Sequence, residues 1–139
     1  MNVPQTTPTQ AFATLQAHPD AVYLDVRTEP EFAAGHPAGA RNVPVLFVDP
    51  ATRRPNPNPD FVAVVERNFP KSTKLLVGCQ SGARSQHACE LLLQAGFTDV
   101  ANVQGSFGGS IDVPGWRDAG LPVGTGEPAG ASYESLKGK

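Results

Sequence analysis

A short apolar run, a loop that contains a cysteine and an amphipathic segment follow one another in the second half of this 139-residue chain. Residues 74–78 are predicted as a buried strand, and residues 83–95 have the apolar spacing of a helix. Cys79 opens the loop between them, so it should lie where the unpaired N–H groups and the positive end of a helix dipole converge. Because such a place binds anions and favours a thiolate over a thiol, we expect nucleophilic sulfur chemistry on an anionic substrate.

Short apolar runs alternate with helical segments along most of the chain. The predicted strands are residues 21–26, 41–44, 74–78 and 100–103, and the predicted helices include residues 9–18, 61–69 and 83–95. This alternation indicates βαβ units, an α/β class and a largely parallel sheet. Ligands bind such sheets at the carboxyl ends of the strands. Since Asp25 and Cys79 both come at the end of a predicted strand, both should lie at the same rim of the sheet.

Local composition predicts how the remaining segments are organised. The capping-box pattern from Thr28 to Glu31 predicts a short helix. Residues 50–59 are rich in Pro and Asn and are predicted as a loop, whereas residues 124–139 are rich in Gly, Pro, Ala and Ser and are predicted as a flexible C-terminal tail. The length fits one domain, so we expect a single domain over residues 1–123 followed by this tail.

Charge and cysteine content argue against several function classes. The 11 basic and 13 acidic side chains give a net charge of −2, which predicts binding neither to nucleic acid nor to a membrane surface. No apolar stretch approaches the roughly 20 residues of a membrane span, and the first residues lack the features of a signal peptide. Two cysteines make no disulfide framework, and no zinc spacing is present, so no metal or other cofactor is expected. Free thiols without an export signal predict a cytoplasmic protein.

Four separated stretches together resemble the rhodanese family. They are residues 24–27 with Glu31 and Phe32, residues 35–44, the loop 79–85, and Gly108-Gly109 with Trp116 and residues 120–123. The match follows the family's order over roughly residues 7–123. It implies a rhodanese-like α/β fold, with a central, mainly parallel sheet of about five strands and helices on both faces.

The resemblance also implies an activity, that of a thiosulfate sulfurtransferase of the rhodanese type. Cys79 would be the nucleophile that carries a sulfane sulfur as a persulfide. The donor would be thiosulfate, a small sulfur-containing anion, or another persulfide donor, and the acceptor cyanide or a thiol. A protein could also accept the sulfur. Such two-step transfer through a covalent intermediate needs the cysteine to be a thiolate at neutral pH.

The loop after the cysteine supplies the predicted anion site. Its members are Gln80, Ser81, Gly82, Ala83, Arg84 and Ser85. Their N–H groups would curl around the sulfur, and Arg84 would orient thiosulfate oxygens through its fork of donors, unless it is a solvated surface arginine. The two serines would either donate to the sulfur or cap the helix. In the resemblance Asp25 and Arg27 have supporting roles: Asp25 holds the loop or an arginine, and Arg27 pairs with an acid or faces the pocket.

Other chemically active side chains are interpreted as structural. His36 lies in a turn motif, and a persulfide transfer needs little base once the thiolate exists. His87 is expected to be exposed. Cys89 is expected to fill the core rather than act as a resolving thiol, and Trp116 is expected in the core as well.

Gln80 stands where many active rhodaneses have an arginine, which removes one cation from the rim and predicts weaker thiosulfate binding. The alternative function is therefore a sulfur carrier or regulatory domain that acts with a protein partner. A cysteine phosphatase or arsenate reductase is less favoured, because those phosphatases place five residues between Cys and Arg. Here four residues, 80–83, lie between Cys79 and Arg84.

Overall fold

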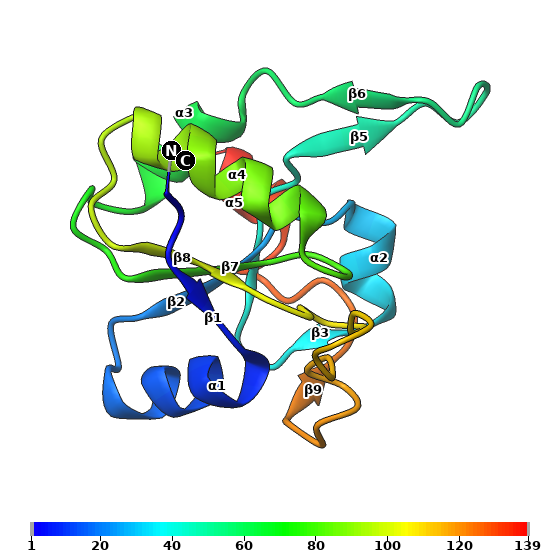
Figure 1. Ribbon diagram of the computed structural model, residues 1–139. Coiled ribbons are helices and arrows are strands. Elements are labelled where there is room, and N and C mark those ends of the chain that lie inside the picture. The colour runs from blue at the N-terminus through cyan, green and yellow to red at the C-terminus, as the bar shows by residue number, and fades with distance from the viewer. Residues whose placement is uncertain (1, 139) are drawn as a thin grey trace.

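A five-stranded parallel sheet forms the centre of the protein (Figure 1) in the computed structural model, which describes residues 2–138. In order across the sheet, its strands are β1 (Gln5–Thr6), β8 (Val100–Val103), β7 (Leu75–Gly78), β2 (Val22–Asp25) and β4 (Arg41–Asn42). Every neighbouring pair is parallel. The predicted α/β class is confirmed, and the sheet is wholly rather than mainly parallel.

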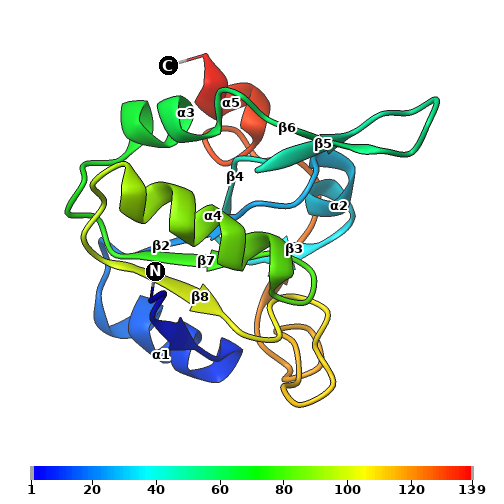
Figure 2. The same cartoon turned by 45° about the horizontal axis from the view of Figure 1, so that its top comes forward.

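Helices cover both faces of the sheet (Figures 1 and 2). Helix α1 (Pro8–Ala17) lies on one face. The opposite face carries α3 (Phe61–Asn68), α4 (Ala83–Gln94) and α5 (Tyr133–Lys137). The short α2 (Glu29–Ala34) lies near the carboxyl ends of the strands, because it begins only four residues after β2 ends.

Alternating side chains of the central strands point to opposite faces of the sheet and pack in two hydrophobic cores. On β2, Leu24 packs with Leu92 of α4 in the core under α3, α4 and α5. Its neighbour Tyr23 points to the other face, where it packs with Ala11 of α1 and with Trp116. This burial on both faces explains why the sequences of the central strands are continuous apolar runs. The burial of Trp116 agrees with its predicted place in the core.

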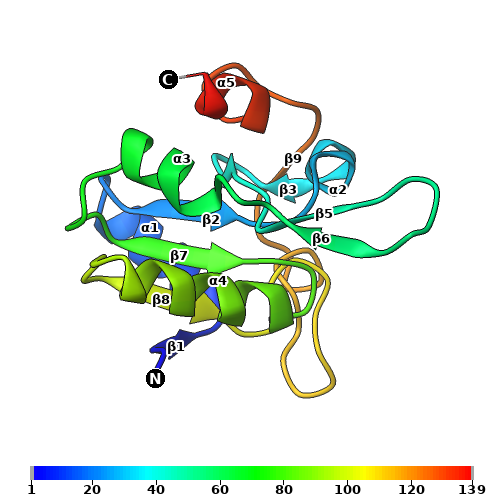
Figure 3. The same cartoon turned by 90° about the horizontal axis from the view of Figure 1, so that it is seen from above.

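Two antiparallel ribbons lie outside the main sheet. Strands β5 (Leu46–Val48) and β6 (Pro55–Pro57) form a hairpin that projects from the body (Figure 3). The sequence predicts only a loop over 50–59. Prolines are tolerated in β6 because a strand with one neighbour leaves the N–H groups of its other edge unpaired. Strands β3 (His36–Pro37) and β9 (Val123–Gly124) form the second ribbon.

The last residues differ from the predicted flexible tail. Ser132 caps α5 by accepting a hydrogen bond from the N–H of Ser135 at 3.2 Å. Tyr133 and Leu136 are buried in the core beneath the helix, and the Tyr133 hydroxyl accepts from Asn58 Nδ2 at 3.2 Å. Two apolar residues three positions apart are too short a pattern to stand out in a segment so rich in Gly, Pro, Ala and Ser.

The packing of α5 predicts a stability loss on truncation of its anchor. Leu136→Ala should lower the free energy of unfolding by about 2–4 kcal/mol, because Leu136 is 1% exposed and its loss leaves a cavity. Urea unfolding followed by circular dichroism measures this. The exposed-face variant Glu134→Ala should stay within about 0.5 kcal/mol of the parent. An unchanged midpoint for Leu136→Ala would mean that the segment is a free tail after all.

Candidate active site

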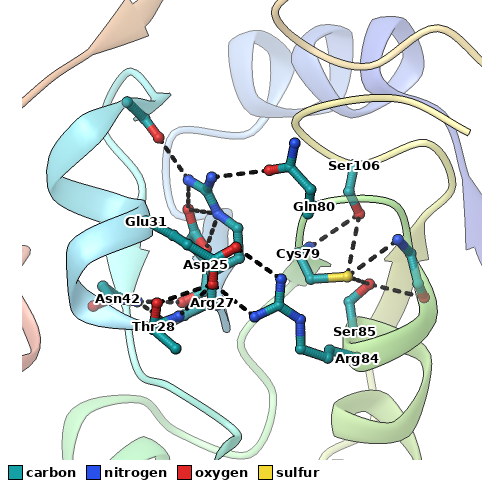
Figure 4. Close-up of polar contacts among 12 residues, drawn as sticks. Asp25, Arg27, Thr28, Glu31, Asn42, Cys79, Gln80, Arg84, Ser85 and Ser106 are labelled. Atoms are coloured by element: carbon teal, nitrogen blue, oxygen red, sulfur yellow. Dashed lines mark hydrogen bonds and ion pairs between the residues drawn. The ribbon is translucent and has the colours of Figure 1, made fainter. Parts of the chain in front are cut away.

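Cys79 lies at the rim of the sheet, between the end of β7 and the start of α4 (Figure 4). Gly78, which precedes it, pairs in register with Asp25 at the end of β2. The parallel topology therefore brings Asp25 and Cys79 to the same rim, as expected from the strand order. The cysteine is recessed, with 2% of its surface exposed.

Hydrogen-bond donors surround the sulfur. The N–H of Gly82 donates to Cys79 Sγ at 3.1 Å, and the Ser85 hydroxyl lies 3.4 Å from it. Gly82 has φ +121°, a conformation that glycine adopts without strain. That turn aims its N–H back at the sulfur and begins α4 in the next residue. The arrangement is a cradle for an anionic sulfur, which the sequence predicts for this loop.

The same donors shift the acidity of the thiol. Burial alone would raise the pKa of Cys79, but hydrogen bonds from the Ser85 hydroxyl and from the N–H groups of Ser85, Gly82 and Ser81 outweigh it and lower that pKa below its ordinary value. At Cys89, in the core, burial raises the pKa to about 12. Only one of the two free cysteines is therefore prepared to react as a thiolate, and Cys89 fills the core as predicted.

This difference predicts how the two thiols react with iodoacetamide. Cys79 should be alkylated with a pH midpoint below that of an ordinary thiol, because the thiolate is the nucleophile. Ser85→Ala should move that midpoint to higher pH, since it removes a donor to the thiolate. Mass spectrometry of alkylated peptides at a series of pH values follows both cysteines, with Cys89 as the internal control that stays unmodified. A midpoint that Ser85→Ala leaves in place would contradict the assignment.

Asp25 and Arg27 form a buried ion pair beside the loop (Figure 4). Arg27 Nη2 lies 2.7 Å from Asp25 Oδ2, and Arg27 Nε lies 3.0 Å from Oδ1. Burial raises the pKa of Asp25 even though Arg27 opposes the change. Arg27 Nη1 also donates to Gln80 Oε1 at 3.3 Å, so the pair fixes the first residue of the loop after the cysteine. Asp25 thus holds an arginine and Arg27 pairs with an acid, and the supporting role of both residues in the reaction stays a prediction.

Arg84 has a partner that the sequence reasoning missed. Its two Nη atoms donate to the two carboxylate oxygens of Glu31 at 2.7 and 2.9 Å. Glu31 also accepts from the Thr28 N–H at 3.2 Å as part of the predicted capping box. Partial burial opposes ionisation of Glu31, but Arg84 and Thr28 lower its pKa to about 2. The ion pair fixes α2 against the start of α4, and the role of Arg84 toward thiosulfate stays a prediction.

Two further contacts of the cysteine loop come from the segment around β8. Ser106 Oγ accepts the N–H of Cys79 at 3.0 Å. Asn102 Oδ1 lies 2.5 Å from the Ser85 hydroxyl and competes with the sulfur for its single proton. Neither residue has a local sequence pattern that points to Cys79, since 27 residues separate Ser106 from it. Of the remaining loop members, Ser81 and Ala83 are exposed.

Among the contacts of the described residues, none joins His36 or His87 to the Cys79 sulfur. His36 is buried, stacks on Phe32 with ring centroids 3.8 Å apart and contacts the Phe32 carbonyl through Nδ1. His87 is exposed on α4. Both therefore agree with the structural roles predicted for them.

Within residues 2–138 no cluster of three His, Cys, Asp or Glu side chains is arranged to hold a metal ion. In the same part of the chain no helix has the length and apolar composition needed to cross a membrane.

The rhodanese-like domain family matches residues 8–110, and the chain belongs to that family of sulfurtransferases. It is 43% identical over 101 residues to thiosulfate sulfurtransferase 16, chloroplastic, of Arabidopsis thaliana, an alignment that covers 73% of this chain and 78% of that protein. It is 40% identical over 99 residues to the mitochondrial protein HIGH ARSENIC CONTENT 1 of the same plant, covering 71% of this chain and 54% of that protein.

Among solved structures, the fold is similar to the crystal structure of Rv0390 from M. tuberculosis. The TM-score is 0.76 at 30% identity, and the match covers 91% of this chain and 100% of that one. The predicted family and fold class are thus confirmed. The names of the relatives include chloroplastic and mitochondrial proteins, so a cytoplasmic location stays a prediction.

Proposed function

We propose that the protein is a sulfurtransferase that carries a sulfane sulfur on Cys79 as a persulfide. The donor is thiosulfate or another persulfide donor, and the acceptor is cyanide or a thiol. The observation that carries this proposal is the recessed Cys79 sulfur, whose pKa is lowered by hydrogen bonds from Ser85, Gly82 and Ser81 against the effect of burial. It occurs in a chain of the rhodanese-like family, with a relative named as a thiosulfate sulfurtransferase.

The first step loads the cysteine. The Cys79 thiolate attacks the outer sulfur of thiosulfate, a bond forms between the two sulfurs, and the S–S bond of the donor breaks. Sulfite leaves with the electron pair of that bond. The N–H groups that hold the thiolate then face the persulfide, whose outer sulfur is also anionic. This preorganised cradle needs no metal, since the charge that develops is met by fixed dipoles.

The second step discharges the cysteine. Cyanide or a thiolate attacks the outer sulfur, and Cys79 leaves as the thiolate that the cradle stabilises. Free enzyme therefore alternates with a persulfide form. Steady-state measurement of thiocyanate from thiosulfate and cyanide should give the parallel double-reciprocal lines of ping-pong kinetics. Intersecting lines, or no turnover with thiosulfate or with glutathione persulfide, would contradict the proposal.

A sulfur carrier with a protein partner is the second candidate, and Gln80 favours it. Arg27 holds the amide oxygen of Gln80, and Arg84 is paired with Glu31, so the described loop presents no unpaired guanidinium to thiosulfate. A carrier would accept sulfur readily from a persulfide donor and turn over thiosulfate slowly. Comparing kcat/KM for the two donors separates the candidates.

Arsenate reduction is the less favoured alternative for a reactive cysteine loop, and one relative is named for arsenic content, a name that states no activity. Arsenate-dependent consumption of a thiol reductant tests it directly, and loss of thiol without arsenate serves as the blank. The four-residue spacing between Cys79 and Arg84 argues against it. A rate equal to the blank would remove this candidate.

A further inference from the structure

A cavity of about 380 Å³ opens beside Gln80, the residue that follows the nucleophile. Arg27, Gln80, Phe107 and Arg117 contribute to its wall. The N–H of Phe107 donates to the carbonyl oxygen of Cys79 at 3.1 Å, so the cavity adjoins the backbone of the reactive cysteine. Its volume falls within the range of sites for small ligands, about 300–1,000 Å³.

Two guanidinium groups gather on one aromatic ring in this cavity. The Arg27 Cζ lies 4.6 Å from the centroid of Phe107, and the Arg117 Cζ lies 5.5 Å from it. Asp25 compensates the charge of Arg27 in the buried ion pair. Within residues 2–138 the one acid paired with Arg117 is Asp118, at 3.8 Å, and both side chains are more than half exposed. Such a contact is weak, so Arg117 brings an incompletely compensated positive charge to the cavity.

The remaining acid at the cavity does not cancel this charge. Glu31 lines the same wall, but both of its carboxylate oxygens accept hydrogen bonds from Arg84. The electrostatics of the wall therefore favour an anionic ligand, and a guanidinium fork suits a planar carboxylate.

Gln80 adds a neutral donor to the same wall. Arg27 Nη1 donates to Gln80 Oε1 at 3.3 Å, which fixes the amide with its NH₂ group on the other side. That group lies against Gly108, where a Cβ would collide with it. Gly108 thus leaves room for the amide. Within residues 2–138, Gln80 Nε2 donates to no protein acceptor, and Gln80 is one of the residues that line the cavity.

We propose that this cavity binds the carboxylate of a small acceptor thiol, and this inference rests on the proposed function. Arg117 and Gln80 would hold the carboxylate, and the thiol would reach the persulfide on the adjoining Cys79. The thiolate of the acceptor forms a bond to the outer persulfide sulfur, and the bond between that sulfur and Cys79 Sγ breaks. The electron pair leaves with Cys79 as a thiolate, and the outer sulfur leaves on the acceptor as the anionic terminal sulfur of a new persulfide. No oxidant or reductant is needed.

The test compares two acceptors that differ only in charge, 3-mercaptopropionate and 3-mercaptopropionamide. The protein is first loaded with sulfur and freed of donor, and intact mass then follows the loss of sulfur at matched, subsaturating thiolate concentrations. We expect the acid to discharge the parent protein about tenfold faster than the amide, as a charge-assisted pair at a partly exposed site allows.

Variants of Arg117 locate the source of that preference. Arg117→Gln should bring the ratio of the acid rate to the amide rate close to one, whereas Arg117→Lys should keep most of it by retaining the charge. Arg53→Gln, on the projecting hairpin, is the matched control for loss of one positive charge and should keep the full ratio. Equal rates for acid and amide in the parent, or an unchanged ratio in Arg117→Gln, would overturn the subsite. A protein that takes up no sulfur at the loading step would instead contradict the proposed function.

Discussion

Replacing Cys79 by alanine should abolish sulfur transfer, with a fall in turnover of at least about a thousandfold. The reason is that every step runs through this sulfur. The variant keeps the N–H groups of Gly82 and Ser81 but has no nucleophile for them to stabilise. Thiocyanate formation from thiosulfate and cyanide measures the loss, with circular dichroism to show that the variant is folded.

Cys89→Ala is the matched control for this substitution. Cys89 is buried in the core on α4, and burial raises its pKa to about 12. The Cys89→Ala variant should therefore lose some stability, as other truncations in a core do, but it should retain its turnover. Residual turnover in Cys79→Ala close to that of the parent, or loss of turnover in Cys89→Ala while it remains folded, would contradict the assignment of the nucleophile.

Arg27→Met should lower the free energy of unfolding by about 3–5 kcal/mol, because it leaves the Asp25 carboxylate buried without its partner. The loss should depend on pH. Burial already raises the pKa of Asp25 in the folded protein, and removal of Arg27 raises it further. The folded state then binds the proton more tightly than the unfolded state, so stability falls as the pH rises through and above the unfolded value of about 4. The deficit should be larger near neutral pH than at acidic pH.

The double variant Asp25→Asn with Arg27→Met separates the buried charge from lost packing. It should be more stable than Arg27→Met at neutral pH, because no uncompensated carboxylate remains, and its deficit should vary less with pH. Urea unfolding at several pH values measures all three proteins. A deficit in Arg27→Met that is independent of pH would show that the ion pair does not act through the charge of Asp25.

The central strands were predictable because each is a continuous apolar run in the sequence and is buried on both faces of the sheet. Strands β2 and β7 are buried on both faces, so their apolar runs are continuous. The capping box at Thr28 marked the start of α2. Once these elements were placed, parallel topology alone put Asp25 and Cys79 at one rim. The position of the Cys79 loop at the rim of the sheet could therefore be predicted from the sequence.

Other features depend on contacts between distant parts of the chain. The ion pair between Arg84 and Glu31 joins residues 53 positions apart in the sequence, and the contact of Ser106 with Cys79 joins residues 27 positions apart. Polar partners at such separations leave no periodic pattern. Helix α5 is stabilised by Tyr133 and Leu136 inside a core that the rest of the chain builds, and the hairpin of β5 and β6 contains prolines that locally favour a loop. In both segments tertiary packing stabilises a helix or a hairpin although the local composition favours a loop.

Intact mass after incubation with thiosulfate is the most direct test of the central claim that Cys79 carries the sulfur. The parent protein should gain one sulfur, about 32 Da, that cyanide removes and that Cys79→Ala never acquires. If thiosulfate gives no gain, the same measurement with polysulfide and glutathione persulfide tests other donors. A folded, reduced protein that gains no sulfur from any of them, or a gain that persists in Cys79→Ala, would contradict the account.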